Sequence, residues 1–236
     1  MLARDYRVVV CEPPSVGMNA KLPYSNAVND MVYYAHRVLN HLGIDQCHWV
    51  GQSAGGVVGA ALHSAAPGRI QSLTLIGTPM LSQGRLKVHL AATTALLAGS
   101  KLGRRLLAAR IVKDLGYRDE KEKKLISRYF SRLLEQLDPK TIGALRPIDG
   151  ASVRRVFERL RQNPPPMLVL GGEADPIVLL RDQRTVAEIT QARFVKVPTG
   201  HMTLLVEPDV CAHAFFRFMQ HLQHPSSRPT PLSEAA

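Results

Sequence analysis

Gly51-Gln52-Ser53-Ala54-Gly55 is the stretch of sequence that decides the fold. It has the pattern Gly-x-Ser-x-Gly, which is typical of a serine on a sharp turn between a strand and a helix. The residues before it, Cys47 to Val50, predict a short strand, and the small residues that follow, up to about Ala66, predict a helix. The pentapeptide alone is a weak signal, but this context is the one in which such a turn carries a nucleophile.

A serine on this turn is expected to have a strained backbone. We expect Gly51 and Gly55 to be needed because a side chain at either position would collide with neighbouring segments. The oxygen of Ser53 then stands at the start of a helix, where the N–H of Ala54 is directed at negative charge developing on a substrate oxygen. The alternative interpretation is a tight turn in an unrelated parallel sheet.

Two further residues complete a candidate catalytic triad, because a serine nucleophile needs a base and the base needs an orienting acid. Asp175 follows a predicted strand at Met167–Leu170, and His201 follows the last predicted strand at Ala192–Val197. Both lie beyond the carboxyl ends of strands, where open α/β sheets place their sites. Taken alone, Asp175 is also consistent with a helix N-cap, and His201 with an ordinary loop residue. The chain order Ser53, Asp175, His201 favours the triad.

The rest of the chain alternates between strand and helix patterns. Two more runs, Tyr6–Cys11 and Ile70–Ile76, predict buried strands. Helices are predicted for the ranges 26–42, 86–98, 102–115, 120–137, 153–162, 181–189 and 209–222. This alternation predicts an α/β protein with a mostly parallel sheet and helices on both faces.

Composition excludes several classes of protein. The chain has 236 residues, 45% of them hydrophobic and 21% charged, which is unlike a disordered chain or a collagen-like fibre. The length suits one large domain, or one domain with an insertion. Cys11, Cys47 and Cys211 have no metal-ligand spacing, and with no signal-peptide pattern they favour a reduced, cytoplasmic setting. We expect no metal ion and no cofactor.

The positive charge is concentrated in the middle of the chain. Residues 80–164 hold 19 of the 30 basic and 8 of the 19 acidic residues, an excess that equals the whole net charge of +11. Arg104, Arg105 and Arg110 flank apolar residues, as on a helix at an interface. The pattern favours an acidic carrier protein or an anionic membrane surface as partner. The alternative is that the charge only keeps a helical lid soluble. Nucleic acid is not expected, since few aromatic residues are interleaved.

Taken together, these motifs resemble the lipase- and esterase-type members of the α/β-hydrolase superfamily. Range 50–79 resembles the nucleophile elbow with its following helix and strand, 170–176 the acid loop, and 198–208 the histidine loop. The resemblance implies an α/β-hydrolase fold with a helical cap inserted into it. It divides the chain into a first core part at 1–79, a cap at 80–164, a second core part at 165–223 and a flexible tail at 224–236.

The beginning of the sequence departs from this pattern. Relatives have an apolar strand ending in a His-Gly turn before the strand that corresponds to Tyr6–Cys11, and this turn supplies a second oxyanion amide. We therefore expect the N-terminal strands to be missing here. Their absence would leave unpaired strand edges and only half of the oxyanion hole.

The resemblance implies a serine hydrolase that cleaves an ester or thioester of an apolar acyl group. Ser53 is the expected nucleophile, His201 the base, Asp175 the orienting acid and Ala54 an oxyanion donor. Two alternatives remain open. One is a truncated or non-catalytic hydrolase-fold protein that acts as a binding module, and the other is a lyase or peroxidase-like reaction on the same fold.

Overall fold

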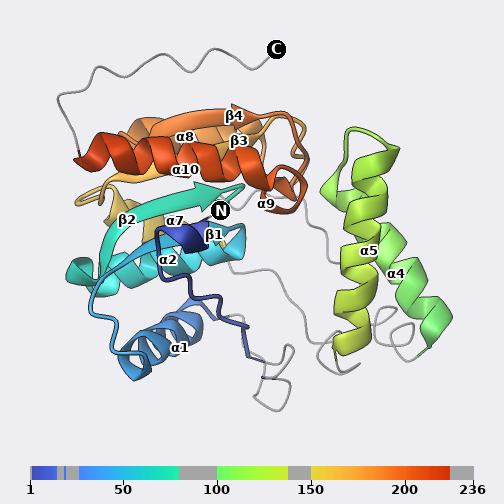
Figure 1. Ribbon diagram of the computed structural model, residues 1–236, viewed down its shortest axis with the longest axis horizontal. Helices are drawn as coiled ribbons and strands as arrows, with labels where there is room; N and C mark the ends of the chain where they lie inside the picture. Colours follow the sequence, from blue (N-terminus) through green and yellow to red (C-terminus); the bar gives the residue numbers. More distant parts are fainter. Residues whose placement is uncertain (1, 15–18, 20–26, 80–99, 138–149, 224–236) are drawn as a thin grey trace.

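A four-stranded parallel sheet forms the centre of the structure, a computed structural model that describes residues 2–14, 19, 27–79, 100–137 and 150–223. The strands are arranged in chain order across the sheet, β1-β2-β3-β4, with helices on both faces (Figure 1). Their bounds are β1 Cys47–Gln52, β2 Ile70–Ile76, β3 Met167–Gly172 and β4 Arg193–Val197. The fold is therefore of the α/β class that the sequence predicts, with a parallel sheet between helical layers.

The two middle strands are buried on both faces. In β2 and β3 all residues except Gln71 are buried, which fits their nearly continuous apolar sequences. The register pairs Leu73 with Met167 and Ile76 with Leu170. This central position explains why the patterns of these two strands are the clearest in the sequence.

Four helices cover one face of the sheet. They are α1 (Val28–His41), α2 (Ala54–Ala65), α7 (Gly150–Leu160) and α8 (Leu180–Thr190). Their buried side chains, with those from that face of the strands, form the largest apolar cluster. Its members include Leu39, Val57, Leu62, Leu73, Leu75, Phe157, Val169 and Val186. Thus α7, although it belongs to the basic middle segment of the sequence, packs against the core.

Helix α10 (Pro208–Gln223) covers the other face. Phe215 and Phe218 pack on Ile76 and Leu170 from the strands. Tyr6, from the N-terminal segment, lies edge-on to Phe215 with ring centroids 5.6 Å apart. The aromatic residues of α10 therefore pack against the sheet and also against the N-terminal segment of the described chain.

The segment after Tyr6 does not form the buried strand that the sequence predicts. Val8, Val9 and Val10 are 48%, 39% and 87% exposed. Among the described residues the segment joins no strand ladder, and β1 pairs with β2 alone. The prediction for Tyr6–Cys11 is wrong because β-branched residues form a strand only where a neighbouring strand makes hydrogen bonds with their backbone N–H and C=O groups.

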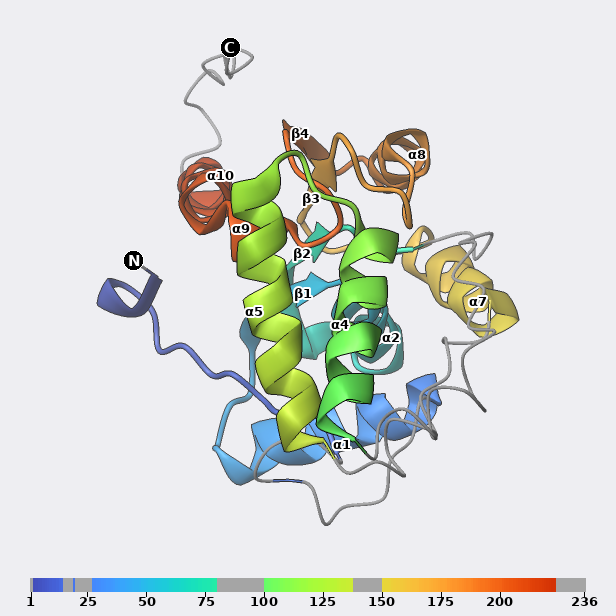
Figure 2. The same cartoon turned by 90° about the vertical axis from the view of Figure 1, so that its right-hand side faces the viewer.

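Two antiparallel helices, α4 (Lys101–Leu115) and α5 (Glu120–Gln136), lie side by side beyond the carboxyl ends of the strands (Figure 2). We call this pair the α4–α5 hairpin. Each helix has a side-chain N-cap: Ser100 accepts a hydrogen bond from the N–H of Gly103, and Asp119 accepts one from Glu122. Leu107 and Ala108 of α4 pack with Leu134 and Leu137 across the hairpin.

The described residues also form three short helical elements. They are η1 (Leu2–Arg4), η3 (Pro67–Arg69) and α9 (Thr203–Val206). The predicted helix at 86–98 and the predicted loose tail at 224–236 lie outside the described residues. Within the described ranges, no helix has the length and apolar character needed to cross a membrane.

Candidate active site

Ser53 lies on the turn between β1 and α2 with a backbone that few side chains adopt. Its φ is 51° and its ψ is −121°, a conformation that costs free energy and persists only where the surroundings enforce it. The N–H of Ser53 donates to the carbonyl of Ile76, 2.8 Å away, at the end of the neighbouring strand β2. The turn is thus held directly against the sheet, as the Gly-x-Ser-x-Gly pattern requires.

Close approach around this turn depends on Gly51 and Gly56. A Cβ on Gly51 would lie 2.4 Å from the backbone of Gly55, and a Cβ on Gly56 would lie 2.0 Å from Oγ1 of Thr78. A Cβ on Gly55 would meet no atom within 4 Å. The role expected for Gly55 therefore belongs to Gly56, because the glycine that faces Thr78, just after β2, is one position further along the helix.

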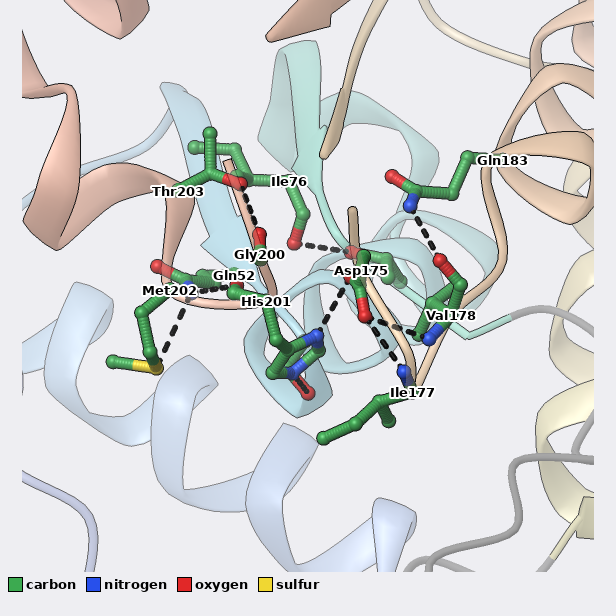
Figure 3. Close-up of polar contacts among 12 residues, drawn as sticks. Gln52, Ile76, Asp175, Ile177, Val178, Gln183, Gly200, His201, Met202 and Thr203 are labelled. Carbon is green, nitrogen blue, oxygen red and sulfur yellow. Dashed lines mark hydrogen bonds and ion pairs between the residues drawn. The ribbon is translucent and has the colours of Figure 1, made fainter. Parts of the chain in front are cut away.

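Asp175 is buried, 3% exposed, in the loop after β3. Its Oδ1 accepts hydrogen bonds from the N–H groups of Ile177 (2.8 Å) and Val178 (2.9 Å), and its Oδ2 lies 2.8 Å from Nδ1 of His201 (Figure 3). The two backbone donors satisfy one carboxylate oxygen and so direct the other toward the imidazole. Gly77 faces this pair, since a Cβ there would lie 3.2 Å from Oδ2.

His201 is also buried, 4% exposed, in the loop between β4 and α9. Its Nε2 lies 3.1 Å from Oγ of Ser53. Its backbone N–H donates to the carbonyl of Leu115 (3.1 Å), and its carbonyl accepts from Nε2 of Gln52 (2.8 Å). The structure therefore brings Ser53, His201 and Asp175 into one chain of hydrogen bonds.

The hydrogen bonds from Asp175 through His201 to Ser53 have the arrangement needed to accept a proton from the serine hydroxyl. A neutral imidazole whose Nδ1–H is held by a carboxylate presents Nε2 as an acceptor to the serine hydroxyl. Ala54, which follows Ser53, is the first residue of α2. Its N–H therefore lies at the N-terminus of the helix, where backbone N–H groups have no partner within the helix and favour negative charge. All four residues singled out in the sequence thus lie at one place, at the carboxyl end of the sheet.

The α4–α5 hairpin contacts the loops that carry Asp175 and His201. Val112, Leu115 and Ile126 of the hairpin form one apolar cluster with residues of these loops and of α9. These partners include Ile177, Met202, Leu205 and Val206. Arg118, between the two helices, is paired with Glu122 and lies 2.9 Å from the carboxylate of Glu207 just before α10. The hairpin is therefore fixed by apolar packing and by ion pairs next to the site.

A second Ser–His contact in the molecule differs from this site. Nδ1 of His48 lies 2.9 Å from Oγ of Ser72, but Ser72 is fully buried, and its hydroxyl is directed at the sulfur of Met219. Burial lowers the pKa of His48. With no access for a substrate to Ser72, the contact serves packing beneath α10.

Cys211 is also unsuited to nucleophilic chemistry. It is buried on α10, and its thiol lies 3.9 Å from the carbonyl of Thr203. Burial, with a smaller effect from the charge of Glu207, raises the pKa of its thiol to about 12. The thiolate is the reactive form, so Cys211 stays an inert thiol at neutral pH.

Sequence reasoning missed the residues that position His201. Gln52 occupies a variable position of the Gly-x-Ser-x-Gly pattern, and Leu115 contributes only a backbone carbonyl, so neither carries a motif. The one available signal is that Gln52 adjoins Ser53 and is long enough to reach a neighbouring loop.

Comparisons with known proteins agree with this architecture. A family model described as alpha/beta hydrolase fold matches residues 1–208. A protein of Mycobacterium phage D29 named as a non-heme haloperoxidase is 26% identical over 215 residues, which cover 88% of this chain and 75% of that protein. A protein of Azorhizobium caulinodans named as a carbamate hydrolase, RutD, is 24% identical over 219 residues, covering 89% and 79%. A thermophilic esterase from Thermogutta terrifontis superimposes with a TM-score of 0.75 at 19% identity, over 94% of this chain and 82% of its own, a likeness of fold.

Proposed function

Because the chain belongs to the α/β hydrolase fold family, we propose that it is a serine hydrolase that cleaves an ester or thioester of an apolar acyl group. The observation that carries the proposal is the hydrogen-bonded chain from Ser53 Oγ through His201 to Asp175, with distances of 3.1 and 2.8 Å. The name of one relative, a carbamate hydrolase, adds support for hydrolysis as the reaction class.

In the first half of the reaction, Ser53 Oγ attacks the substrate carbonyl carbon while Nε2 of His201 takes the hydroxyl proton. Negative charge collects on the former carbonyl oxygen, where the N–H of Ala54 stabilises it. The tetrahedral intermediate collapses, the bond to the alcohol or thiol breaks, and His201 returns its proton to that leaving group. Asp175 holds the imidazole in the tautomer that both transfers need.

In the second half, a water molecule attacks the acyl group on Ser53. His201 takes a proton from this water and then gives it to Ser53 Oγ as the ester bond breaks, which releases the carboxylic acid and restores the enzyme. No metal ion or cofactor enters either half.

We also propose that part of the segment 80–164 acts as a cap, represented among the described residues by the α4–α5 hairpin. Its apolar residues Val112, Leu115 and Ile126 pack on the loops that hold Asp175 and His201. We infer from this that apolar residues of the hairpin also lie next to the bound acyl group, and such surroundings favour an apolar acyl group over a charged one.

For a partner, we propose an acidic carrier protein or an anionic membrane surface that presents the acyl group to the basic hairpin. Arg105 and Lys113 are exposed on α4, and the exposed Leu102 and Leu106 lie on the same side of this helix. Arg104 does not contribute as the sequence suggested. It donates to the carbonyls of Leu134 (2.8 Å) and Glu135 (3.0 Å), so it caps the end of α5.

The proposal is tested with a fluorophosphonate probe, which reacts with an activated serine. We expect wild-type protein to be labelled on Ser53, as identified by peptide mass, and Ser53→Ala to remain unlabelled. Ser72→Ala is the matched control, because Ser72 also contacts a histidine but is fully buried. Labelling that persists in Ser53→Ala contradicts the proposal. A folded wild-type protein without labelling or esterase activity supports the non-catalytic alternative.

The acyl preference is tested with p-nitrophenyl esters of increasing chain length, one acyl thioester and one carbamate. We expect kcat/KM to rise with the length of the acyl chain, since each buried CH₂ contributes about 0.8 kcal/mol. A preference for the shortest ester, or for the carbamate over every ester, would overturn the apolar-acyl part of the proposal and leave the serine chemistry intact.

A further inference from the structure

The side chain of Gln52 joins the nucleophile's strand to the loop of the base. Its Nε2 donates a hydrogen bond to the backbone carbonyl of His201, 2.8 Å away, and also lies 3.8 Å from the sulfur of Met202 (Figure 3). We propose that Gln52 is a positioning residue that sets the distance and orientation between Ser53 and His201. This inference rests on the proposed function, because it concerns the same serine and histidine.

The sheet topology shows why such a bond is needed. Ser53 follows β1 and His201 follows β4, and these two strands lie at opposite ends of the order β1-β2-β3-β4. Within the sheet, β1 and β4 are connected only through the hydrogen bonds of β2 and β3. Small changes in the twist between neighbouring strands therefore add up between Ser53 and His201. The Gln52 side chain connects the two edges directly, without the intervening strands.

Together with the Ser53–His201 contact, this bond closes a small ring. The ring passes from Ser53 to Gln52 along the backbone, from Gln52 to the carbonyl of His201, and from the imidazole back to Oγ of Ser53 at 3.1 Å. A ring leaves the imidazole less freedom than one contact would. Reaction at Ser53 depends steeply on this geometry, since a displacement of about 1 Å can cost on the order of 100-fold in rate.

Four residues contact the four polar groups of His201, and two of them, Gln52 and Ser53, are adjacent in the chain. Asp175 holds Nδ1, Ser53 lies at Nε2, Leu115 accepts from the backbone N–H, and Gln52 donates to the carbonyl. Only Gln52 among these partners comes from the strand that carries the nucleophile itself. The Gln52 bond is therefore the one that ties the position of the base to the position of the serine.

The test compares Gln52→Met with Gln46→Met. Methionine has nearly the shape of glutamine but donates no hydrogen bond. Gln46 precedes β1 at the far end and donates the same kind of bond, from its side-chain amide to the carbonyl of Gly68 at 3.0 Å. We expect Gln52→Met to lower kcat by about 10- to 100-fold with KM within about two-fold, and Gln46→Met to leave both near wild type.

Two further variants separate positioning from general destabilisation. Gln52→His restores an N–H donor of similar reach, so we expect it to recover most of the lost kcat. Gln52→Glu removes the donor and adds a carboxylate near the imidazole, which favours the imidazolium form. We therefore expect the acid limb of its kcat/KM profile to move to higher pH, whereas Gln52→Met keeps the wild-type profile at a lower rate. A merely structural role predicts no recovery of kcat in Gln52→His, and the pH shift of Gln52→Glu checks only that position 52 lies close enough to act on the imidazole.

The outcomes also distinguish this inference from the proposed function. If wild-type protein is labelled on Ser53 by fluorophosphonate but Gln52→Met is labelled at the same rate and turns over equally fast, the positioning role is wrong and the serine hydrolase stands. If Gln52→His is as impaired as Gln52→Met, the donor is not what matters, and the role is again wrong. If wild-type protein has no reactive Ser53, the proposed function fails first.

Discussion

The backbone N–H of His201 donates a hydrogen bond to the carbonyl of Leu115, 3.1 Å away, so the last residue of helix α4 holds the residue that we propose as the base. The adjacent glycines make this approach possible. A Cβ on Gly200 would lie 2.5 Å from the carbonyl oxygen of Gly116, and a Cβ on Gly116 would lie 2.9 Å from Pro176 in the acid loop. The position of the hairpin and the position of the imidazole are therefore coupled.

Gly200→Ala should separate the hairpin from the histidine loop. The new methyl group meets backbone atoms, which cannot rotate away, so either α4 or the loop of His201 must shift. We expect kcat to fall by about 10- to 100-fold and the unfolding free energy to drop by about 1–3 kcal/mol. Gly68→Ala is the control, since a Cβ there meets nothing within 4 Å. Unchanged turnover in Gly200→Ala would show that the hairpin and the base are not coupled.

Asp175→Asn should impair the reaction more than the fold. The amide oxygen can still accept from the N–H groups of Ile177 and Val178, but its NH₂ group then faces Nδ1 of His201 and favours the tautomer with hydrogen on Nε2. That tautomer cannot take the proton of Ser53. We expect kcat to fall by about 10⁴-fold with a nearly unchanged melting temperature.

Asp175 and His201 should also act as one unit. The double variant Asp175→Asn/His201→Ala is expected to be no slower than His201→Ala alone, because both changes disable the same proton transfer. Losses in kcat that multiply in the double variant would mean that the two side chains work independently.

The buried thiol of Cys211 should make stability depend on pH in the alkaline range. Its pKa is raised from 9.0 to about 12 in the folded protein, mainly by burial, so unfolding releases its proton between these values. The unfolding free energy therefore falls as pH rises from about 9 toward about 12, by up to about 1.4 kcal/mol per pH unit. Cys211→Ala lacks this titration.

Urea unfolding at several pH values checks this effect. We expect the stability advantage of wild type over Cys211→Ala to be constant below about pH 9 and to shrink above it. Iodoacetamide at neutral pH should modify the exposed Cys11 before Cys211. Parallel pH curves for the two proteins, or rapid modification of Cys211 in the folded state, would show that the thiol is not held in its neutral form.

Salt should affect only substrates that the basic hairpin recruits. Exposed charges are screened over about 8 Å at physiological ionic strength, so turnover of an ester in anionic vesicles or on an acidic carrier should fall steeply as salt rises, while a short neutral ester is unaffected. Arg105→Gln should reproduce the effect of salt for the recruited substrate. Arg154→Gln, an equal loss of charge on the exposed side of α7, is the control. If salt changes the turnover of both substrates equally, the charge of the hairpin only keeps its surface solvated and does not recruit a substrate.

The sequence predicted best where the local pattern and the tertiary environment agree. The strand at Ile70–Ile76 has its predicted bounds, and the helices at 102–115 and 120–137 differ from α4 and α5 by one residue at an end. These elements are apolar on the side that the fold buries. The turn around Ser53 was also recognisable, because Gly51 is required where the backbone of Gly55 approaches closely.

The failures all concern contacts that local sequence does not contain. Tyr6–Cys11 has strand-forming residues but no described neighbour to pair with. Gly56, which meets Thr78, could be distinguished from Gly55 only once the distance to the next strand was known. The bonds of Gln52 and Leu115 to His201 join residues far apart in the sequence, so no motif records them.

The order of the strands also bears on how the protein becomes active during synthesis. Because β1, β2, β3 and β4 are adjacent in the order in which the ribosome makes them, each new strand can join the edge left by the one before. Ser53 is made before β2, yet His201 follows β4, the last strand among the described residues. The nascent chain therefore carries its proposed nucleophile without the proposed base until β4 has been made, and the appearance of activity would report that β4 and the loop after it are in place.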